Sequence, residues 1–428
     1  MDKKNAITGS PDIEHRYAEA RKHYAALDVD TDSAIRQLSS IPLSIHCWQG
    51  DDVIGFDGAS RLSGGILATG SYPGRARNGD ELRQDAELAF SLIPGKKRFN
   101  LHAMYAETGN SKVDRDGFEP EHFSRWLAWA KDRHVGLDFN PSFFSHPLAE
   151  SGFTLSSADE DVRKFWVRHG IACRRISQYF ADELKDTVVN NSWLPDGYKD
   201  VPADRLGPRL RLQESLDTMY RETMPNDRVI DTVESKLFGI GSESYVVGSH
   251  EFYMGYASKR NMGLCLDMGH FHPTETIADK ISSLLLFVPQ IAIHMSRGVR
   301  WDSDHIVTWN EDLQNVCNEI VRIKAWDRIH ILLDYFDASI NRIAAWVIGA
   351  RSVQKALLFA LLEPIDLIRG YEAKRDYFRR LALMEEAKNL PFAPVWDYYC
   401  LTQSVPLGNA WFDRVSQYED EVLKRRKN

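Results

Sequence analysis

Residues 262–270 read MGLCLDMGH, a short apolar run that ends in an acidic residue and is followed by a turn with a histidine. A short apolar run of this kind is typical of a strand buried on both faces, as in a parallel sheet. Asp267 and His270 then stand at the carboxyl end of the strand, where parallel α/β folds place their functional groups. The stretch therefore predicts a parallel sheet with a polar site at one end.

Similar apolar runs recur along the chain and alternate with amphipathic segments. Residues 119–133, 159–184 and 311–323 carry apolar side chains at helical spacing. The strand candidates are residues 42–48, 98–105, 135–140, 187–193, 234–240, 262–268, 290–296 and 328–334. Eight strand–helix units predict an α/β fold, a closed (β/α)8 TIM barrel, with an open doubly wound sheet as the simpler alternative.

Both ends of the chain are expected to be helical. Tyr17, Ala20, Tyr24 and Leu27 stand at helical spacing near the start. After residue 338 the strand pattern stops, and residues 340–362, 365–388 and 410–426 read as helices separated by prolines. We therefore expect an N-terminal helical segment at 1–40, the barrel at 41–338 and a C-terminal helical extension at 339–428.

The composition is that of a large globular protein and argues against several classes of partner. The chain has 428 residues, 53 Lys and Arg against 61 Asp and Glu, and a net charge of −8. This balance gives no electrostatic reason to expect nucleic acid or an anionic membrane. The five cysteines form no C-x-x-C motif, and the N-terminus has no apolar leader. We expect a reduced, cytoplasmic protein.

Polar residues end most of the strand candidates. They are His46 and Trp48, His102, Asp138 and Asn140, Trp193 and Asp196, Glu234 and Lys236, Asp267 and His270, His294, and Asp334. In a barrel these ends converge on one face, where buried charges are costly unless they are paired or bound to metal. Any one of them alone is more simply a hydrogen-bonded core residue, but the set predicts an active site.

The second half of this set has the chemistry of metal ligands. Carboxylates and imidazoles without thiolates suit Mn²⁺, Mg²⁺, Co²⁺ or Zn²⁺. Glu234 and Lys236 are two residues apart, so on a strand they would point to the same face. Asp302 and Asp304 follow the seventh strand and, in an extended chain, point the same way; a solvated turn is the alternative. The ligands from Glu234 to Asp334 are numerous enough for two ions.

Eight strings of sequence together resemble the L-rhamnose isomerase family. They are SIHCWQGDD (44–52), NLHA (100–103), LDFNPS (137–142), WLPDG (193–197), VESKLFG (233–239), CLDMGHFH (265–272), VRWDSDH (299–305) and DYFDASINR (334–342). The resemblance runs from about residue 12 to the end of the chain. It implies a xylose-isomerase-like barrel with two divalent cations, a homotetramer, and interconversion of L-rhamnose and L-rhamnulose in L-rhamnose catabolism.

The resemblance also implies two ligand sets. One ion matches Glu234, Asp267, His294 and Asp334; it would be buried and would orient the sugar oxygens. The other matches His270, Asp302 and Asp304 with water, and would be the mobile, catalytic ion. Mn²⁺ is the expected metal, with Zn²⁺ or Co²⁺ as alternatives at the buried site.

The remaining expectations concern the substrate. The resemblance places Lys236 at the O1 end of the sugar and His102 and Trp193 in the sugar pocket, so the expected catalytic residues are Lys236, His102 and Asp302. Trp48 and Phe336 complete the expected substrate contacts, Phe336 beside Val53 and Ile54 at the methyl end.

The expected mechanism is a metal-assisted 1,2-hydride shift on the open-chain sugar, in preference to an ene-diol route. Three alternatives to L-rhamnose isomerisation remain: an isomerase of another aldose, a metal-dependent hydrolase on the same barrel, and a sugar-binding barrel without catalysis.

Overall fold

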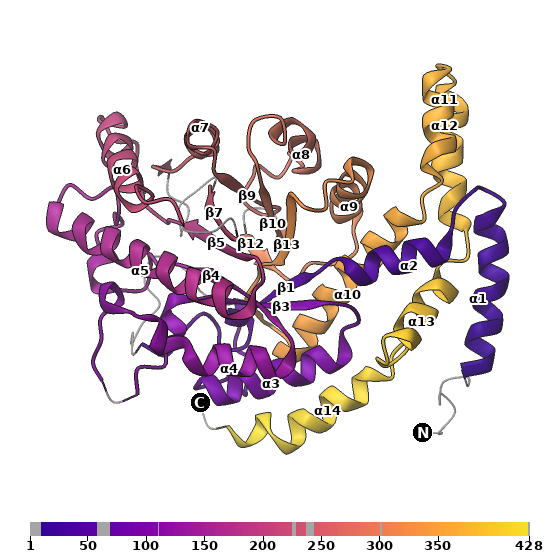
Figure 1. Cartoon of the computed structure of the whole chain (residues 1–428), viewed down its shortest axis with the longest axis horizontal. Helices are drawn as coiled ribbons and strands as arrows, with labels where there is room; N and C mark the ends of the chain where they lie inside the picture. The colour runs from indigo at the N-terminus through magenta and orange to yellow at the C-terminus, as the bar shows by residue number, and fades with distance from the viewer. Residues whose placement is uncertain are drawn as a thin grey trace.

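The computed structural model describes residues 10–57, 69–109, 111–224, 228–236, 244–299 and 302–426, with the backbone only at residues 10, 69 and 302–304. Eight parallel strands in these ranges close into a barrel (Figure 1). In chain order they are β1 (Leu43–His46), β3 (Lys97–His102), β4 (Gly136–Asn140), β5 (Val188–Trp193), β7 (Val229–Glu234), β9 (Gly263–Asp267), β10 (Ile291–Met295) and β13 (Ile329–Leu333). The predicted (β/α)8 TIM barrel is confirmed.

The fifth strand was predicted in the wrong place. The structure has β7 at Val229–Glu234, where residues 234–240 were expected, and residues 237–240 lie outside the described part of the chain. Asp231 interrupts the apolar run of β7, but its carboxylate is paired with Arg174 Nη2 at 2.9 Å. The shift means that Glu234 ends its strand and that Lys236 lies beyond it.

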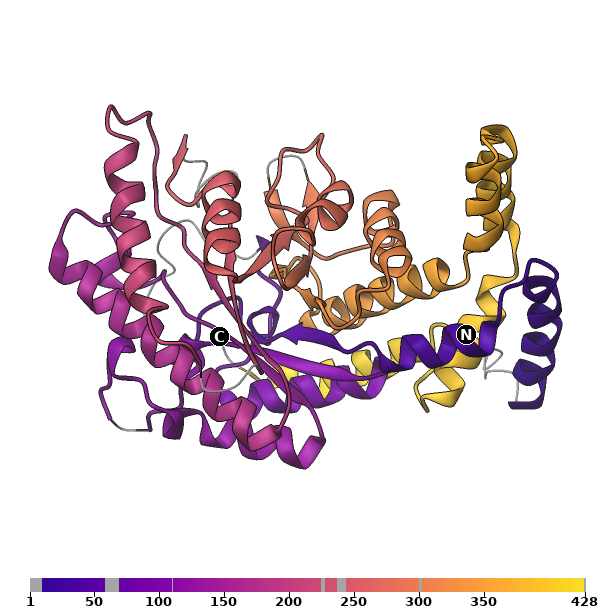
Figure 2. The ribbon, with the colours of Figure 1, turned by 45° about the horizontal axis from the view of Figure 1, so that its top comes forward.

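Helices surround the barrel on its outside (Figures 1 and 2). They are α3 (Gly79–Leu92), α4 (Ser124–Arg133), α5 (Glu160–Leu184), α6 (Leu206–Met219), α7 (His250–Arg260), α8 (Ala278–Leu284), α9 (Glu311–Ile323) and α10 (Arg342–Leu361). Helices α5 and α9 match the sequence expectation because both have clear caps. Asp159 and Asn310 accept backbone N–H bonds at their N-termini, and Lys185 and Lys324 take the left-handed conformation at their ends.

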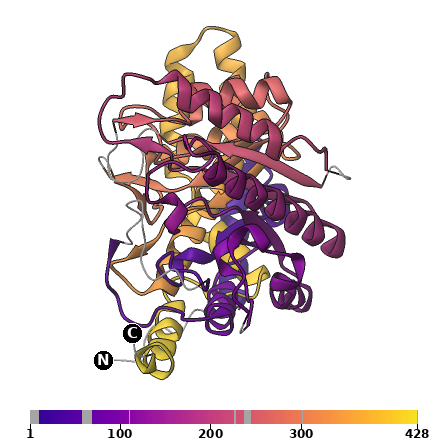
Figure 3. The same cartoon turned by 90° about the vertical axis from the view of Figure 1, so that its left-hand side faces the viewer.

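Further helices lie at both ends of the chain. They are α1 (Ser10–Ala25), α2 (Thr31–Ser40), α11 (Ile365–Ala373), α12 (Tyr377–Glu386), α13 (Phe392–Thr402) and α14 (Trp411–Glu421). Helix α1 packs on α13, where the rings of Tyr17 and Tyr398 stack at 4.0 Å. Helices α11 and α12 project from one side of the molecule and α14 lies at the opposite side (Figure 3). The division into three segments stays a prediction.

Helix α13 was missed by the sequence analysis. Pro391 was taken to break the chain, but it stands directly before the first turn of α13, and Pro394 lies within that turn. The first turn of a helix does not use its backbone N–H groups internally, so proline is tolerated there.

Helix α10 is the one helix in the described ranges that is long and apolar enough to cross a membrane by length and composition alone. About 72% of its most apolar window is buried inside the protein. It packs on α9 and α3, and Trp346 Nε1 donates to the carbonyl oxygen of His46 at 2.9 Å. Helix α10 is thus a core helix that covers β1.

Three short strand pairs lie outside the barrel. They are β2 (Thr69–Gly70) with β14 (Asp337–Ala338), β6 (Gly197–Tyr198) with β8 (Tyr245–Val246), and β11 (Arg297–Val299) with β12 (Asp302–His305). Each contains a segment that follows the carboxyl end of a barrel strand. They shape the loops around the end where the polar residues gather.

Candidate metal centre

Four predicted ligands come together at the carboxyl ends of four neighbouring strands. Glu234 ends β7, Asp267 ends β9, His294 lies in β10, and Asp334 directly follows β13. One ligand atom from each lies within 4.8 Å of the others. Glu234, Asp267 and His294 are no more than 2% exposed. The period of two along a strand explains the convergence, because each of these side chains points into the barrel.

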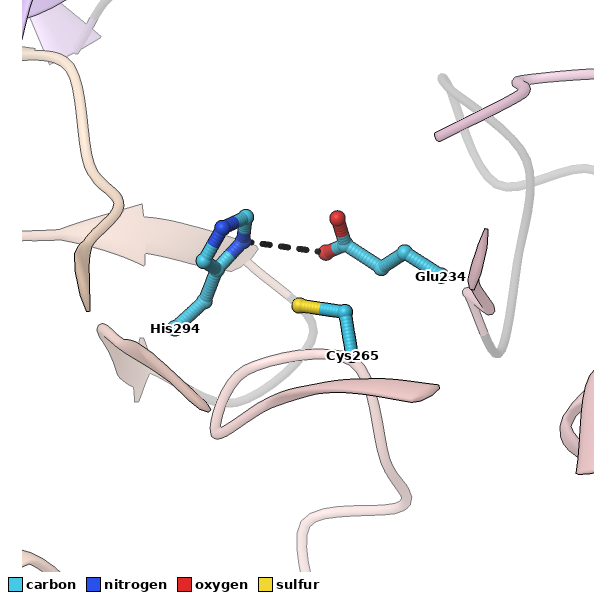
Figure 4. Close-up of side chains that lie close together, drawn as sticks. All are labelled: Glu234, Cys265 and His294. Carbon is cyan, nitrogen blue, oxygen red and sulfur yellow. Dashed lines mark ion pairs between the residues drawn. The ribbon is translucent and has the colours of Figure 1, made fainter. Parts of the chain in front are cut away.

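The imidazole of His294 is at the centre of this cluster. Its Nδ1 lies 3.1 Å from Asp334 Oδ2, 3.3 Å from Glu234 Oε1 and 3.7 Å from Asp267 Oδ2. Figure 4 shows the Glu234 carboxylate and the His294 ring pointing toward one another. Three carboxylate oxygens therefore surround a single ring nitrogen.

Each of the three carboxylates has its other oxygen fixed by the protein. Asn191 Nδ2 donates to Glu234 Oε2 at 2.6 Å. Ser296 Oγ donates to Asp267 Oδ1 at 2.6 Å, and Trp48 Nε1 donates to Asp334 Oδ1 at 2.9 Å. These bonds turn the second oxygen of each group toward the centre, which is how outer partners orient metal ligands.

The inward-facing atoms are buried and lack hydrogen bonds. Glu234 Oε1, Asp267 Oδ2 and both ring nitrogens of His294 have no hydrogen-bond partner among the described residues. Buried polar groups of this kind are costly unless a ligand satisfies them. Oxygen and imidazole donors at these separations fit a divalent cation.

The pKa values of the cluster reflect the crowding of buried carboxylates and imidazoles. Burial, reinforced by the neighbouring Asp334 and Glu234 carboxylates, raises the pKa of Asp267 to about 7. Burial works against protonation of His294, but the negative groups around it outweigh burial and raise the pKa of that imidazole. Burial likewise opposes ionisation of Glu234, yet His294 and His270 lower its pKa. The carboxylates and imidazoles of the cluster thus share protons.

His270 lies beside this cluster. Its Nδ1 is 3.0 Å from Glu234 Oε1 and 3.1 Å from the carbonyl oxygen of Ser235, and its Nε2 is 3.9 Å from Asp267 Oδ2. It was predicted as a ligand of the second ion, together with Asp302 and Asp304.

The side chains of Asp302 and Asp304 lie outside the described residues, so the second ligand set stays a prediction. Their backbone forms β12, which pairs with β11. A β-carbon placed on Gly298 of β11 would come 3.8 Å from the Cα of Gly269. The β11–β12 hairpin therefore runs close to the turn that carries His270.

The predicted substrate residues form an arc of aromatic rings beside the cluster. The His102 ring meets Trp48 edge to face at 4.8 Å and Phe144 at 5.3 Å. Phe144 in turn meets Trp193 at 5.7 Å, and Lys236 Nζ stands 5.5 Å from the centre of the Trp193 ring. The arc joins His102 of β3 and Trp193 of β5 with the segments that follow β1, β4 and β7.

Burial lowers the pKa of His102 to about 3, so its imidazole is neutral at ordinary pH. Its Nδ1 lies 3.1 Å from Ser142 Oγ, which fixes the ring. Val53 is buried, whereas Ile54 and Phe336 are half-buried. Their contribution to a pocket for a methyl group stays a prediction.

Sequence reasoning missed the residues that support the ligands. Asn191 lies in β5, beside the β7 strand of its partner Glu234, and Ser296 directly follows β10, beside the β9 strand of its partner Asp267. Neither residue is part of a recognisable motif. Asn191 stands two residues before Trp193, so the period of two could have pointed to it. Cys265 was also passed over, although it stands two residues before Asp267 on the same strand.

Comparison with known proteins places the chain in one family. The family model described as L-rhamnose isomerase matches residues 11–426. An L-rhamnose isomerase of Rhodopirellula baltica is 55% identical over 97% of this chain and 97% of its own length. One of Yersinia pseudotuberculosis is 56% identical over 97% of this chain and 99% of its own length.

Among solved structures, an L-ribulose 3-epimerase covers 74% of this chain and 95% of its own, with a TM-score of 0.46 and 13% identity. The family assignment rests on the sequence matches, which extend over nearly the whole chain. The chain belongs to the L-rhamnose isomerase family, a family of aldose–ketose isomerases.

Proposed function

We propose that this protein interconverts L-rhamnose and L-rhamnulose at a divalent-metal centre built on Glu234, Asp267, His294 and Asp334. The observation that carries the proposal is the orientation of three carboxylates, each with one oxygen bound by the protein and the other turned toward His294. The names of the relatives, which match almost end to end, support the choice of sugar.

Mn²⁺ is the proposed ion, because hard carboxylate oxygens and one imidazole suit it, and Co²⁺ or Zn²⁺ are alternatives at the buried site. When bound, such an ion acts as a Lewis acid that polarises the sugar oxygens at C1 and C2. Asn191, Ser296 and Trp48 hold the carboxylates in place for it. We also propose His270, Asp302 and Asp304 as ligands of a second ion, since the β11–β12 hairpin runs close to the His270 turn.

Lys236 and His102 are the proposed catalytic groups of the chain itself, together with Asp302. The Lys236 ammonium lies over Trp193, from where it can hold the O1 end of an open-chain sugar. His102 is neutral, so it can accept a proton from the anomeric hydroxyl and return it to the ring oxygen during ring opening. Trp48, Trp193 and Phe336 would contact the C–H faces of the sugar.

The metal requirement is tested with protein freed of metal by chelation and checked for residual ions. Activity on L-rhamnose should vanish and return with Mn²⁺ or Co²⁺. A panel of other aldoses, assayed in parallel, separates an L-rhamnose enzyme from an isomerase of another sugar. Full activity in verified metal-free protein would contradict the metal-dependent proposal, and phosphodiester hydrolysis without isomerisation would favour the hydrolase alternative.

The proposed chemical route is a direct hydride shift between C2 and C1. Glu234 and Asp267, the carboxylates nearest the sugar in this proposal, would both be engaged as ligands and so not free to act as bases. A reaction run in D₂O should therefore leave the transferred hydrogen unlabelled. Substantial deuterium at C1 of the ketose would instead favour an ene-diol route, with His102 as the first base to replace.

We further propose a homotetramer in the cytoplasm, as the family resemblance implies. The mass in solution, measured by light scattering at several protein concentrations, tests the oligomeric state. A monomer at all concentrations would contradict it.

A further inference from the structure

Cys265 lies beside the candidate metal centre, toward the amino end of its strand, and has no role in the proposed reaction. It belongs to β9 and points into the barrel two residues before Asp267. Its Sγ lies within 4.8 Å of one ligand atom each of Glu234 and His294. Figure 4 shows the sulfur beside the gap between the His294 ring and the Glu234 carboxylate.

The two neighbours of the sulfur are buried and unsatisfied. Glu234 Oε1 and both ring nitrogens of His294 have no hydrogen-bond partner in the ranges that the structure describes, and the two side chains are 1% and 2% exposed. Cys265 also has apolar neighbours, because it packs in one cluster with Val189, Ala292 and Leu332. The thiol therefore stands at the boundary between an apolar layer and a set of unsatisfied ligand atoms.

We propose that Cys265, Glu234 and His294 form an additional, deeper cation site that takes thiophilic divalent ions such as Cd²⁺ or Zn²⁺. One sulfur, one nitrogen and one oxygen donor are a ligand set that soft and borderline ions prefer and that Mn²⁺ does not. Binding replaces the thiol proton by the ion, so one proton leaves for each S–metal bond formed and no redox partner is needed.

The deeper site shares two ligands with the upper one. Glu234 and His294 cannot serve both positions fully, so a thiophilic ion at Cys265 should exclude the ion held by Asp267 and Asp334. The effect on activity rests on the proposed function, whereas the thiolate site itself does not. The protein would then discriminate between metals by the depth at which each one binds.

The test uses metal-free, reduced protein titrated with Cd²⁺. The wild type should develop the ultraviolet absorption of a cadmium–thiolate bond, saturating at one ion per chain. Cys265→Ala and Cys265→Ser, checked for folding by circular dichroism, should lose this absorption. Cys317→Ala is the matched control, since Cys317 is also buried but lies in α9, and it should keep the absorption.

A competition experiment measures the shared ligands. Cd²⁺ should displace Mn²⁺ from the wild type, with the released Mn²⁺ followed by electron paramagnetic resonance. Cys265→Ala should need at least about tenfold more Cd²⁺, because loss of even an outer partner of a ligand costs about 10–100-fold in metal affinity.

Cadmium binding to the wild type without thiolate absorption, or the same absorption in both Cys265 variants, would overturn the deeper site. Neither result depends on turnover. Failure of Mn²⁺ to support isomerisation would count against the proposed function alone.

Discussion

Two layers inside the barrel bury charged groups in opposite ways. Near the amino ends of the strands, Arg98 donates from Nε to Asp138 Oδ2 at 2.9 Å and from Nη2 to Asp138 Oδ1 at 3.0 Å, and Ser44 Oγ donates to Asp138 Oδ2 at 2.6 Å. Near the carboxyl ends, Glu234 Oε1, Asp267 Oδ2 and the His294 ring nitrogens have no hydrogen-bond partner within the described part of the chain. The lower layer is satisfied by its own side chains, whereas the upper layer leaves these inward-facing atoms without such partners.

The comparison shows what separates a structural charge from a ligand. Both Asp138 and Asp267 are 1% exposed and lie within or at the end of a barrel strand. Asp138 has a guanidinium beside it, which neutralises it from within the chain. Asp267 has two further carboxylates beside it, and burial with that repulsion raises its pKa to about 7. The same residue type in the same kind of strand thus serves packing in one layer and, in our proposal, ion binding in the other.

The largest effect should come from breaking the lower layer. Asp138→Ala leaves the buried Arg98 with only the partly exposed Asp186 as an acidic partner, and such a loss costs about 3–5 kcal/mol of unfolding free energy. Urea unfolding should show this loss equally with and without Mn²⁺. Ser44→Ala, which removes one neutral donor to the same carboxylate, should cost only about 1 kcal/mol. Equal stability of the two variants would contradict the account of this layer.

Breaking the upper layer should have the reverse pattern. Glu234→Gln keeps an acceptor for Asn191 but removes a ligand charge, so Mn²⁺ affinity and turnover should fall at least about 100-fold. Metal-free Glu234→Gln should lose less stability than Asp138→Ala, because the neutral amide relieves the repulsion of Asp267 and Asp334 although it gives up the pairing with His294 and His270. The stabilisation that Mn²⁺ adds should disappear. Titration calorimetry and thermal unfolding measure the two effects.

A large loss of stability in metal-free Glu234→Gln would show that the upper layer is a structural network like the lower one. Asp334→Asn provides a second test, because Asp334 is the ligand held by Trp48.

The sequence was sufficient for the barrel because strand and helix patterns are local. Seven predicted strands overlap the observed ones, and α5 begins one residue from its predicted start. The errors arose where a single residue interrupted the hydrophobic or helical pattern of an element. Asp231 interrupts the apolar run of β7, so the strand was not recognised. In the fold its carboxylate is neutralised by Arg174, which is distant in sequence. Pro391 was taken as a break between helices, whereas it directly precedes the start of α13.

The clustering of the four proposed ligands was predictable, but the residues that orient them were not. Glu234, Asp267, His294 and Asp334 stand at strand ends, a position that sequence periodicity shows. Asn191 contacts Glu234 only because β5 and β7 pair in the register that sets Asn191 opposite Thr232. Trp48 reaches Asp334 across 286 residues of sequence. Trp48 was expected to contact the sugar. Its hydrogen bond to Asp334 adds an orienting role that composition and spacing do not reveal.

A smaller effect should come from this orienting bond. Trp48→Phe keeps an aromatic ring but removes the N–H that fixes Asp334 Oδ1, so Mn²⁺ affinity should fall by about 10–100-fold. Trp129→Phe is a matched control, because Trp129 Nε1 donates to Glu87 Oε1 at 2.9 Å, outside the barrel. The control should bind Mn²⁺ as the wild type does. Equal Mn²⁺ affinity of both variants would show that Asp334 does not depend on Trp48.

The smallest effect should be the dependence of Mn²⁺ affinity on pH. The pKa of Asp267 is raised to about 7, so below that pH the metal-free protein carries a proton that the ion has to displace. The affinity should therefore fall by up to about tenfold for each pH unit below 7. His294 and His270, whose pKa values are also raised, add to the fall in the same direction.

The unfolding free energy of the metal-free protein should change with pH in the opposite direction to its Mn²⁺ affinity. The pKa of Asp267 is higher in the folded chain than the ~3.9 of an unfolded aspartate. The folded state thus gains from protonation of this group below about pH 4 and loses that gain as pH rises through about 7. Unfolding experiments on either side of pH 7 should show the stabilisation by Mn²⁺ growing as pH rises. The Ser44→Ala variant, which leaves the upper layer unchanged, should keep the wild-type pH dependence. A Mn²⁺ affinity that stays constant from pH 5 to pH 8 would mean that the upper layer holds no proton for the ion to displace, and the contrast between the two layers would then lie in hydrogen bonding alone.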